Sequence, residues 1–266
     1  MENQKINYKK SLGQNFLFDV NLLKAIVKDG LVGAEDTVLE IGAGAGTLTN
    51  QLCKVAKNVI AFEIDKSLQP ILDNVQVKNS NLQIIFGDFM DYDLNNFDMP
   101  NARVVANIPY YITTPIIFKL VERIEKFKSI LVLIQKEVAE RFCAEPNSKE
   151  YGITSVILQS IFDVSIPRVV KKECFTPSPK IDSALCLLVP HQKYQINDFV
   201  GFKNFVHQAF AMRRKTLVNN LKNFYDKAEL EKVLTQYEYP LTVRPEQISV
   251  PNFVKIFETL SNHDGQ

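Results

Sequence analysis

Histidine and cysteine are scarce in this chain, which limits the metal sites it can build. The 266 residues include three histidines and four cysteines. The cysteines are Cys53, Cys143, Cys174 and Cys186, so no C-x-x-C pair is present. Because the paired spacing typical of zinc ligands is missing, the sequence predicts no metal site. We expect the cysteines to be reduced and mostly buried.

Long hydrophobic runs are also absent. Apolar stretches such as Ile130–Ile134 are far shorter than the ~20 residues that a membrane-spanning helix needs. The N-terminal residues Met1–Lys5 are polar and no apolar run follows them, so we expect no signal peptide, no membrane partner and a cytoplasmic location. The composition, 46% hydrophobic and 23% charged, is that of a soluble globular protein.

The chain has almost no net charge, but its basic residues are unevenly distributed. The formal net charge is +1. Ten basic and three acidic residues between Val164 and Lys222 give this segment a charge of +7, which leaves −6 for the rest. This asymmetry favours one face that binds a polyanion, although a solvated charged face without a partner would show the same pattern.

Short β-branched runs alternate with helical patterns over the first two-thirds of the chain. This alternation predicts a parallel sheet with helices on both faces. The expected strands are Thr37–Ile41, Asn58–Ile64, Leu82–Phe86, Arg103–Ala106 and Ser129–Ile134, and the expected helices are Asp19–Gly30, Thr47–Ala56, Lys66–Asn74, Thr114–Ile124 and Tyr151–Ser160. Two later strands, near Asp163–Val170 and Asp182–Val189, lie too close together for a crossover helix and could pair antiparallel.

The pattern changes after Pro190. No strong strand follows, and the expected helices are Asp198–Ala211, Lys215–Phe224, Ala228–Tyr237 and Pro251–Leu260. We therefore predict two domains, an α/β domain at residues 1–192 and a small helical domain at residues 193–266.

A glycine-rich turn follows the first of these strands. Gly42, Gly44 and Gly46 stand directly after Glu40-Ile41, where a helix is expected to begin. Glycine lets the backbone turn sharply and approach a ligand closely, and this spacing differs from that of dinucleotide-binding folds. Glu63 and Asp88 follow the next two strands, where carboxylates could bind ribose hydroxyls and an adenine amino group. These acids do not distinguish NAD from S-adenosylmethionine.

The tetrad Asn107-Ile108-Pro109-Tyr110 ends the fourth strand and suits methyl transfer to a planar, weakly basic nitrogen. The Oδ1 atom of Asn107 could accept one N–H of such a nitrogen, and the carbonyl of Ile108 or Pro109 the other. Pro109 has a fixed φ and favours an extended Ile108. Tyr110 offers a flat face for a base, and Phe175 could close the other side. Core packing is the alternative for both rings.

Together with Gly13-Gln14-Asn15-Phe16-Leu17, these motifs resemble the ribosomal RNA adenine N6-dimethyltransferase family. The resemblance covers nearly the whole chain and is closest to the bacterial enzymes that act on 16S ribosomal RNA. The supporting segments are Gln135–Arg141, Tyr151–Gln159, Phe175–Ser183, Arg213–Leu221 and Arg244–Val250.

The resemblance implies a fold, a cofactor and a substrate. The fold is a Rossmann-like class I methyltransferase sheet of seven strands, the last antiparallel, with a small all-helical C-terminal domain. The substrate is a pair of adjacent adenosines in the 3′-terminal hairpin of 16S ribosomal RNA, within an immature small subunit. We expect a monomer. S-adenosylmethionine would contact Asn15, Leu17, Gly42, Gly44, Glu63, Asp88 and Asn107, and RNA phosphates would contact Arg213, Arg214 and Lys215.

Three other functions share part of this pattern. One is methylation of an adenosine in large-subunit RNA, which uses the same N-terminal and N-I-P-Y motifs. Another is methylation of glutamine side chains in proteins. The third is an RNA-binding assembly or transcription factor on a methyltransferase fold. The segments Phe175–Ser183 and Arg213–Leu221 favour the small-subunit enzyme, and the intact Glu63, Asp88 and Asn107 argue against a dead site.

Overall fold

The structure, a computed structural model, describes Lys9 and residues 13–263. The polar segment Met1–Lys5, on which the expectation of no signal peptide rests, lies outside the described residues. The chain divides into two compact units. The first comprises the chain up to Ala139 together with Ser165–Pro190, and the second comprises Glu140–Val164 and the chain from His191 onward. The second unit therefore includes a segment that the sequence pattern assigns to the α/β domain.

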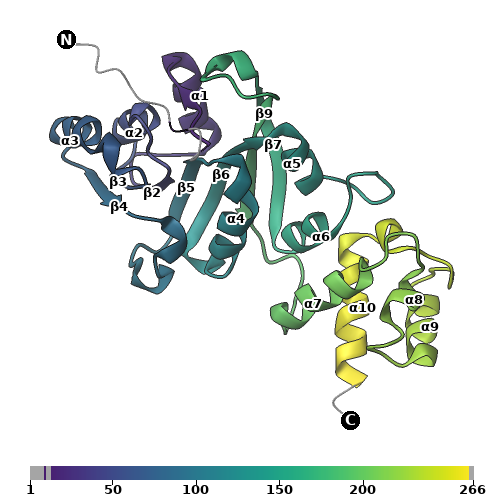
Figure 1. Cartoon of the computed structure of the whole chain (residues 1–266). Helices are drawn as coiled ribbons and strands as arrows, with labels where there is room; N and C mark the ends of the chain where they lie inside the picture. Colours follow the sequence, from purple (N-terminus) through teal and green to yellow (C-terminus); the bar gives the residue numbers. More distant parts are fainter. Residues whose placement is uncertain (1–8, 10–12, 264–266) are drawn as a thin grey trace. The chain divides into compact units, whose positions relative to one another are not determined.

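A seven-stranded sheet with the order β4-β3-β2-β5-β6-β9-β7 forms the centre of the fold (Figure 1). The strands are β2 (Thr37–Ile41), β3 (Asn58–Glu63), β4 (Leu82–Phe86), β5 (Ala102–Asn107), β6 (Phe127–Gln135), β7 (Phe162–Val170) and β9 (Ser183–Pro190). Strands β2 to β6 pair in parallel, and β9 runs antiparallel to β6. The predicted α/β sheet of seven strands, with the last antiparallel, is confirmed.

Both faces of the central strands β2 and β5 are buried. Val38 and Val105 belong to a hydrophobic cluster with Leu23 of α1. The neighbouring residues Leu39 and Val104, whose side chains point to the opposite face, are also buried. Because both faces are covered, the strands are almost continuously apolar. The helices of this part of the chain are α1 (Val20–Asp29), α2 (Thr47–Cys53), α3 (Gln69–Lys78), α4 (Thr113–Val121) and α5 (Lys136–Phe142).

Three elements have no counterpart among the predicted ones. Helix α5 lies largely within Gln135–Arg141, where the sequence pattern predicts no helix. Strand β1 (Phe16–Leu17) pairs antiparallel with β8 (Phe175–Thr176) in a separate two-stranded sheet. A strand of two residues has no periodicity to detect, so only the tertiary structure reveals this pairing.

The second unit is a helical bundle around phenylalanine side chains. Phe205 packs against Phe253 and Phe257, with ring centroids 6.3 and 5.6 Å away. All three are buried. The hydroxyl of Tyr151 donates a hydrogen bond of 2.8 Å to the carbonyl of Ile248. This bond links the segment Glu140–Val164 to the rest of the second unit. The helices are α6 (Ile153–Gln159), α7 (Phe199–Ala209), α8 (Leu217–Leu221), α9 (Lys227–Gln236) and α10 (Val250–His263).

Within the described residues, none of the helices combines the length and hydrophobicity that a membrane crossing requires. No cluster of histidine, cysteine and acidic side chains there could hold a metal ion. All four cysteines are free thiols. Cys53 and Cys186 are buried, Cys143 is partly buried and Cys174 is exposed.

Candidate active site

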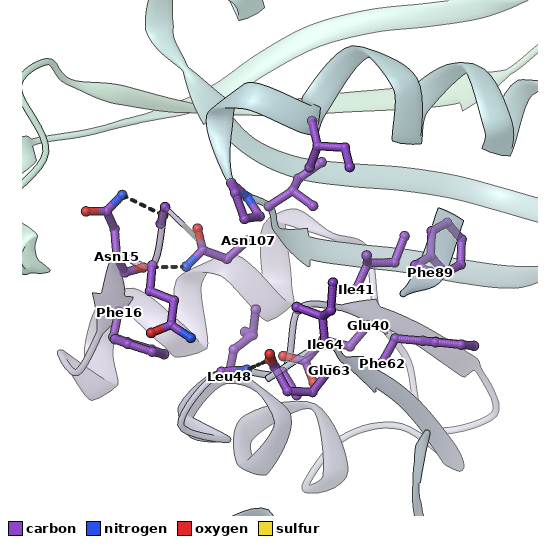
Figure 2. A pocket seen from close by; sticks show the side chains of 18 of the residues that line it. Asn15, Phe16, Glu40, Ile41, Leu48, Phe62, Glu63, Ile64, Phe89 and Asn107 are labelled. Carbon is purple, nitrogen blue, oxygen red and sulfur yellow. Dashed lines mark hydrogen bonds between the residues drawn. The ribbon is translucent and has the colours of Figure 1, made fainter. Parts of the chain in front are cut away.

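A pocket lies at the carboxyl ends of β2, β3, β4 and β5, within the first unit (Figure 2). In parallel sheets this edge is where loops diverge and leave room for a ligand. Side chains from five separate stretches of the chain meet there. The lining includes residues 13–17, 40–44, 62–64, 87–89 and 107–112. Every cofactor-binding residue predicted from the sequence lines this pocket, as do Pro109 and Tyr110.

The glycine turn follows a path that side chains would obstruct. Gly42 and Gly44 have φ angles of +83° and +58°, in the left-handed region that favours glycine. A Cβ atom at Gly44 would lie 2.7 Å from the ring of Phe16, and one at Gly42 would lie 3.3 Å from the carbonyl oxygen of Asn107. The turn therefore brings bare backbone to the pocket wall, as close approach to a ligand requires.

Glu63 is held in place by backbone amides. Its carboxylate accepts hydrogen bonds from the N–H of Gly44 (2.7 Å) and of Asp65 (2.8 Å). Burial raises the pKa of Glu63 above its ordinary value, although these hydrogen bonds act in the opposite direction. The hydrogen bond between Glu63 and the Gly44 amide links the end of β3 to the turn after β2 (Figure 2). Glu63 and the glycine turn therefore form one side of the pocket.

Two further acids line the pocket. Asp88 caps the turn after β4, accepting the N–H of Met90 at 2.8 Å through one carboxylate oxygen. Glu40 is 1% exposed, and neither of its carboxylate oxygens has a hydrogen-bond partner among the residues that the structure describes. Burial raises the pKa of Glu40 to about 8. A buried carboxyl group without a partner is costly, and such groups are typical of functional sites.

The orientation of Asn107 follows from its partner. Its Nδ2 atom donates a hydrogen bond of 3.0 Å to the backbone carbonyl of Asn15 (Figure 2). A carbonyl can only accept, so the amide must direct its nitrogen toward Asn15. With respect to the described residues, the Oδ1 atom of Asn107 therefore remains available as an acceptor in the pocket.

Hydrogen bonds also fix the positions of Tyr110 and of the Pro109 carbonyl before it. The Pro109 carbonyl accepts the N–H of Ile112 (3.2 Å) and the hydroxyl of Thr113 (3.4 Å). The Ile108 carbonyl has no such bond among the described residues, so it is the better second acceptor. The Tyr110 hydroxyl lies 2.7 Å from the Oγ of Ser183, in a hydrogen bond that fixes the half-buried ring.

Phe175 is not brought into this pocket. The residue is 4% exposed, belongs to the hydrophobic cluster that includes Leu23 and Val105, and is absent from the pocket lining. The reason is the pairing of β1 with β8, which sets Phe175 opposite Leu17. The core-packing alternative describes Phe175 in this conformation.

The three basic residues predicted to bind RNA lie in the second unit, in the exposed loop between α7 and α8. The guanidinium of Arg213 donates a hydrogen bond to the carbonyl of Lys149. Arg214 and Lys215 form no ion pair with the described residues, so both charges face solvent.

One polar cluster beside the pocket was missed by the sequence analysis. Asp65 is buried, and its carboxylate accepts hydrogen bonds from Lys9 Nζ (2.6 Å) and Gln14 Nε2 (2.9 Å). Burial opposes ionisation, but these bonds and those from Ser67 outweigh it and hold the pKa of Asp65 at about 2. The cluster ties the segment before β1 to the end of β3. Its only sequence signal is the position of Asp65 two residues after Glu63.

The fold and this site together define a class of protein. The sheet is mostly parallel with an antiparallel last strand. A glycine turn, acids after successive strands and an Asn-Ile-Pro-Tyr turn meet at its edge. This combination is that of an S-adenosylmethionine-dependent methyltransferase. The chain belongs to the ribosomal RNA adenine dimethylase family, whose sequence model matches residues 5–262.

Relatives and solved structures agree with this assignment. The chain is 40% identical to ribosomal RNA small subunit methyltransferase A of Bacillus mycoides, over 99% of this chain and 94% of the relative. It is also 40% identical to the protein of that name from Lactococcus lactis, over 96% and 90%. The structure of a dimethyladenosine transferase from Plasmodium falciparum superposes with a TM-score of 0.83, at 26% identity over 94% of this chain and 98% of that one. The fold is also that of the 23S rRNA methyltransferase ErmE, with a TM-score of 0.75 at 23% identity over 93% and 100%.

Proposed function

We propose that this protein dimethylates the exocyclic N6 of two adjacent adenosines in the 3′-terminal hairpin of 16S ribosomal RNA. The substrate would be an immature small subunit in the cytoplasm, and the enzyme would act as a monomer. Two relatives at 40% identity over nearly the full chain are small-subunit methyltransferases, which favours this substrate over large-subunit RNA. The observation that carries the chemistry is the orientation of Asn107, whose Oδ1 is left free by the bond to Asn15.

The pocket fits S-adenosylmethionine. Gly42 and Gly44 would hold it against bare backbone, Glu63 would bind the ribose hydroxyls, and Asp88 would accept the adenine amino group. Asn15 and Leu17 would cover it from the segment that leads into β1. When bound, this cofactor supplies an electrophilic methyl group.

The residues of the Asn-Ile-Pro-Tyr turn would bind and orient the target amine. In the first transfer the amine would donate its two N–H groups to Oδ1 of Asn107 and to the carbonyl of Ile108, and in the second transfer its one remaining N–H would donate to one of these acceptors. Both acceptors draw the nitrogen lone pair out of conjugation with the adenine ring. No residue needs to act as a strong base, because the nitrogen becomes acidic after methylation and loses its proton to solvent. Alignment of the reacting atoms would supply much of the rate.

Tyr110 would stack on the target base. Stacking of a base on an aromatic ring contributes about 1–3 kcal/mol, which offsets part of the few kcal/mol needed to unstack a nucleotide. The hydrogen bond to Ser183 orders the ring before RNA binds, so little side-chain entropy is lost on binding.

Arg214 and Lys215 would bind phosphates. Their charges face solvent, and contacts of this kind position RNA without reading its sequence. We expect the double variant Arg214→Gln/Lys215→Gln to lower the slope of log affinity against log salt concentration by roughly 1.5–2. Lys227, which lies on α9 and forms an ion pair with Glu231, serves as a control from another part of the helical unit.

The decisive experiment uses methyl-labelled S-adenosylmethionine and small subunits from cells that lack this modification. Large subunits, naked RNA and bulk protein are the parallel substrates, and nucleoside digestion locates the label. Label in N6,N6-dimethyladenosine from the small subunit alone is the expected result. Label from large-subunit RNA or from protein would refute the proposed substrate. Absence of label, with binding to the particle intact, would refute the catalytic proposal and leave an assembly factor.

A further inference from the structure

An exposed aromatic side chain at the pocket has no role in the function proposed above. Tyr111 directly follows Tyr110 in the 3-10 turn Tyr110–Ile112 and lines the same pocket. Its side chain is nevertheless 64% exposed. Its hydroxyl forms no hydrogen bond with the described residues. An aromatic ring that is open to solvent at the edge of a pocket can stack on a planar ligand such as a nucleobase.

The ring of Tyr111 lies close to Gly13. A Cβ atom built at Gly13 would lie 3.6 Å from two carbon atoms of this ring and 3.3 Å from the Cβ of Pro109. Gly13 has a φ of +61°, in the left-handed region that favours glycine. One edge or face of the ring therefore lies beside the Gly13 backbone, while 64% of the residue stays exposed. A ring exposed to this extent is accessible to a planar ligand.

Neither Phe175 nor Tyr110 is available to stack on a second base. Phe175 is buried in the core, and the Tyr110 hydroxyl is bonded to Ser183. Successive residues in a 3-10 turn leave the backbone about 120° apart, because one turn contains about three residues. Tyr110 and Tyr111 therefore point in different directions, and a base stacked on one ring is not stacked on the other.

We propose that Tyr111 stacks on the nucleobase next to the target adenosine and holds the substrate strand at the rim of the pocket. This inference rests on the proposed function, in which the substrate is RNA with two adjacent target adenosines. Each adenosine in turn would occupy the site at Asn107 while a neighbouring base lies on Tyr111. Stacking is tolerant of base identity, so Tyr111 would position the strand and contribute little sequence selectivity.

The test compares Tyr111→Ala, Tyr111→Phe and wild type on unmethylated small subunits. For Tyr111→Ala we expect kcat/KM to fall roughly 5- to 150-fold, the range that corresponds to loss of one stacked base. The affinity for S-adenosylmethionine should stay within about twofold, and Tyr111→Phe should retain wild-type kinetics. Phe18→Ala is the matched control, because Phe18 is 42% exposed and does not line the pocket. Thermal melting verifies that each variant is folded.

A fluorescent base gives a readout that a merely structural residue would not change. In hairpin RNA with 2-aminopurine beside the target adenosine, wild type should quench the fluorescence and Tyr111→Ala should not. Unchanged kcat/KM and quenching in Tyr111→Ala would overturn the proposal, as would a loss confined to cofactor affinity. Failure of wild type to methylate the small subunit is a separate result and would count against the proposed function. Wild-type quenching lost in Tyr111→Ala would still support the stacking role.

Discussion

The substitution Gly44→Ala tests whether the glycine turn is a cradle for the cofactor. Gly44 has a φ of +58°, and a residue with a Cβ in this region costs about 1–2 kcal/mol. The new Cβ would also lie 2.7 Å from the ring of Phe16, which is buried and must be displaced from its rotamer at a cost of about 0.5–1.5 kcal/mol. The expected loss of folding free energy is therefore about 2–3 kcal/mol, or a fall in Tm of about 4–10 °C.

Cofactor binding should suffer as well, because the turn and Phe16 both line the pocket. A shift of the turn also weakens the bond between the Gly44 amide and Glu63. We expect calorimetric titration to show at least a roughly tenfold loss of affinity for S-adenosylmethionine, which corresponds to about 1.4 kcal/mol. Gly87→Ala is the control for stability, because no atom lies within 4 Å of a Cβ built there. A Gly44→Ala protein with wild-type Tm and affinity would refute this account of the turn.

Three further predictions concern Asn107, Asp65 and Glu40. Asn107→Ala should lower kcat by about 100-fold or more while RNA binding stays within about twofold, and retained methyl transfer would remove this side chain from the mechanism. Hydrogen bonds outweigh burial and depress the pKa of Asp65 from 3.8 to about 2. The ionised carboxylate therefore stabilises the folded state by about 2 kcal/mol. This contribution is complete above about pH 4 and is lost as the pH falls toward 2. Melting curves of Asp65→Asn should lack this acid-dependent loss, and a wild-type profile in the variant would contradict the assigned ion pair. Burial raises the pKa of Glu40 from 4.5 to about 8, so wild-type stability should decline as the pH rises between these values, by an amount on the order of 4–5 kcal/mol. Glu40→Gln should abolish that decline. Equal pH profiles of stability for the two proteins would show that the pKa of Glu40 is not raised.

The sequence by itself determined the sheet and the residues that meet in the pocket. The strands Thr37–Ile41 and Leu82–Phe86 were predicted with the bounds that the structure has, because both are short apolar runs bounded by polar residues and turns. Glu63, Asp88 and Asn107 could be predicted to meet because each follows or ends a parallel strand, and such ends share one edge of a sheet. These are local patterns, and a local pattern is visible in a sequence.

Only the tertiary structure decided which neighbours each side chain meets. The sequence leaves Phe175 open between base stacking and core packing, and its pairing opposite Leu17 places it in the core. The segment Glu140–Val164 belongs to the helical unit through long-range contacts such as that between Tyr151 and Ile248. The free Oδ1 of Asn107 depends on a bond to Asn15, 92 residues earlier in the chain. Each of these outcomes rests on contacts between residues far apart in the sequence, so no periodicity or spacing in the sequence encodes them visibly.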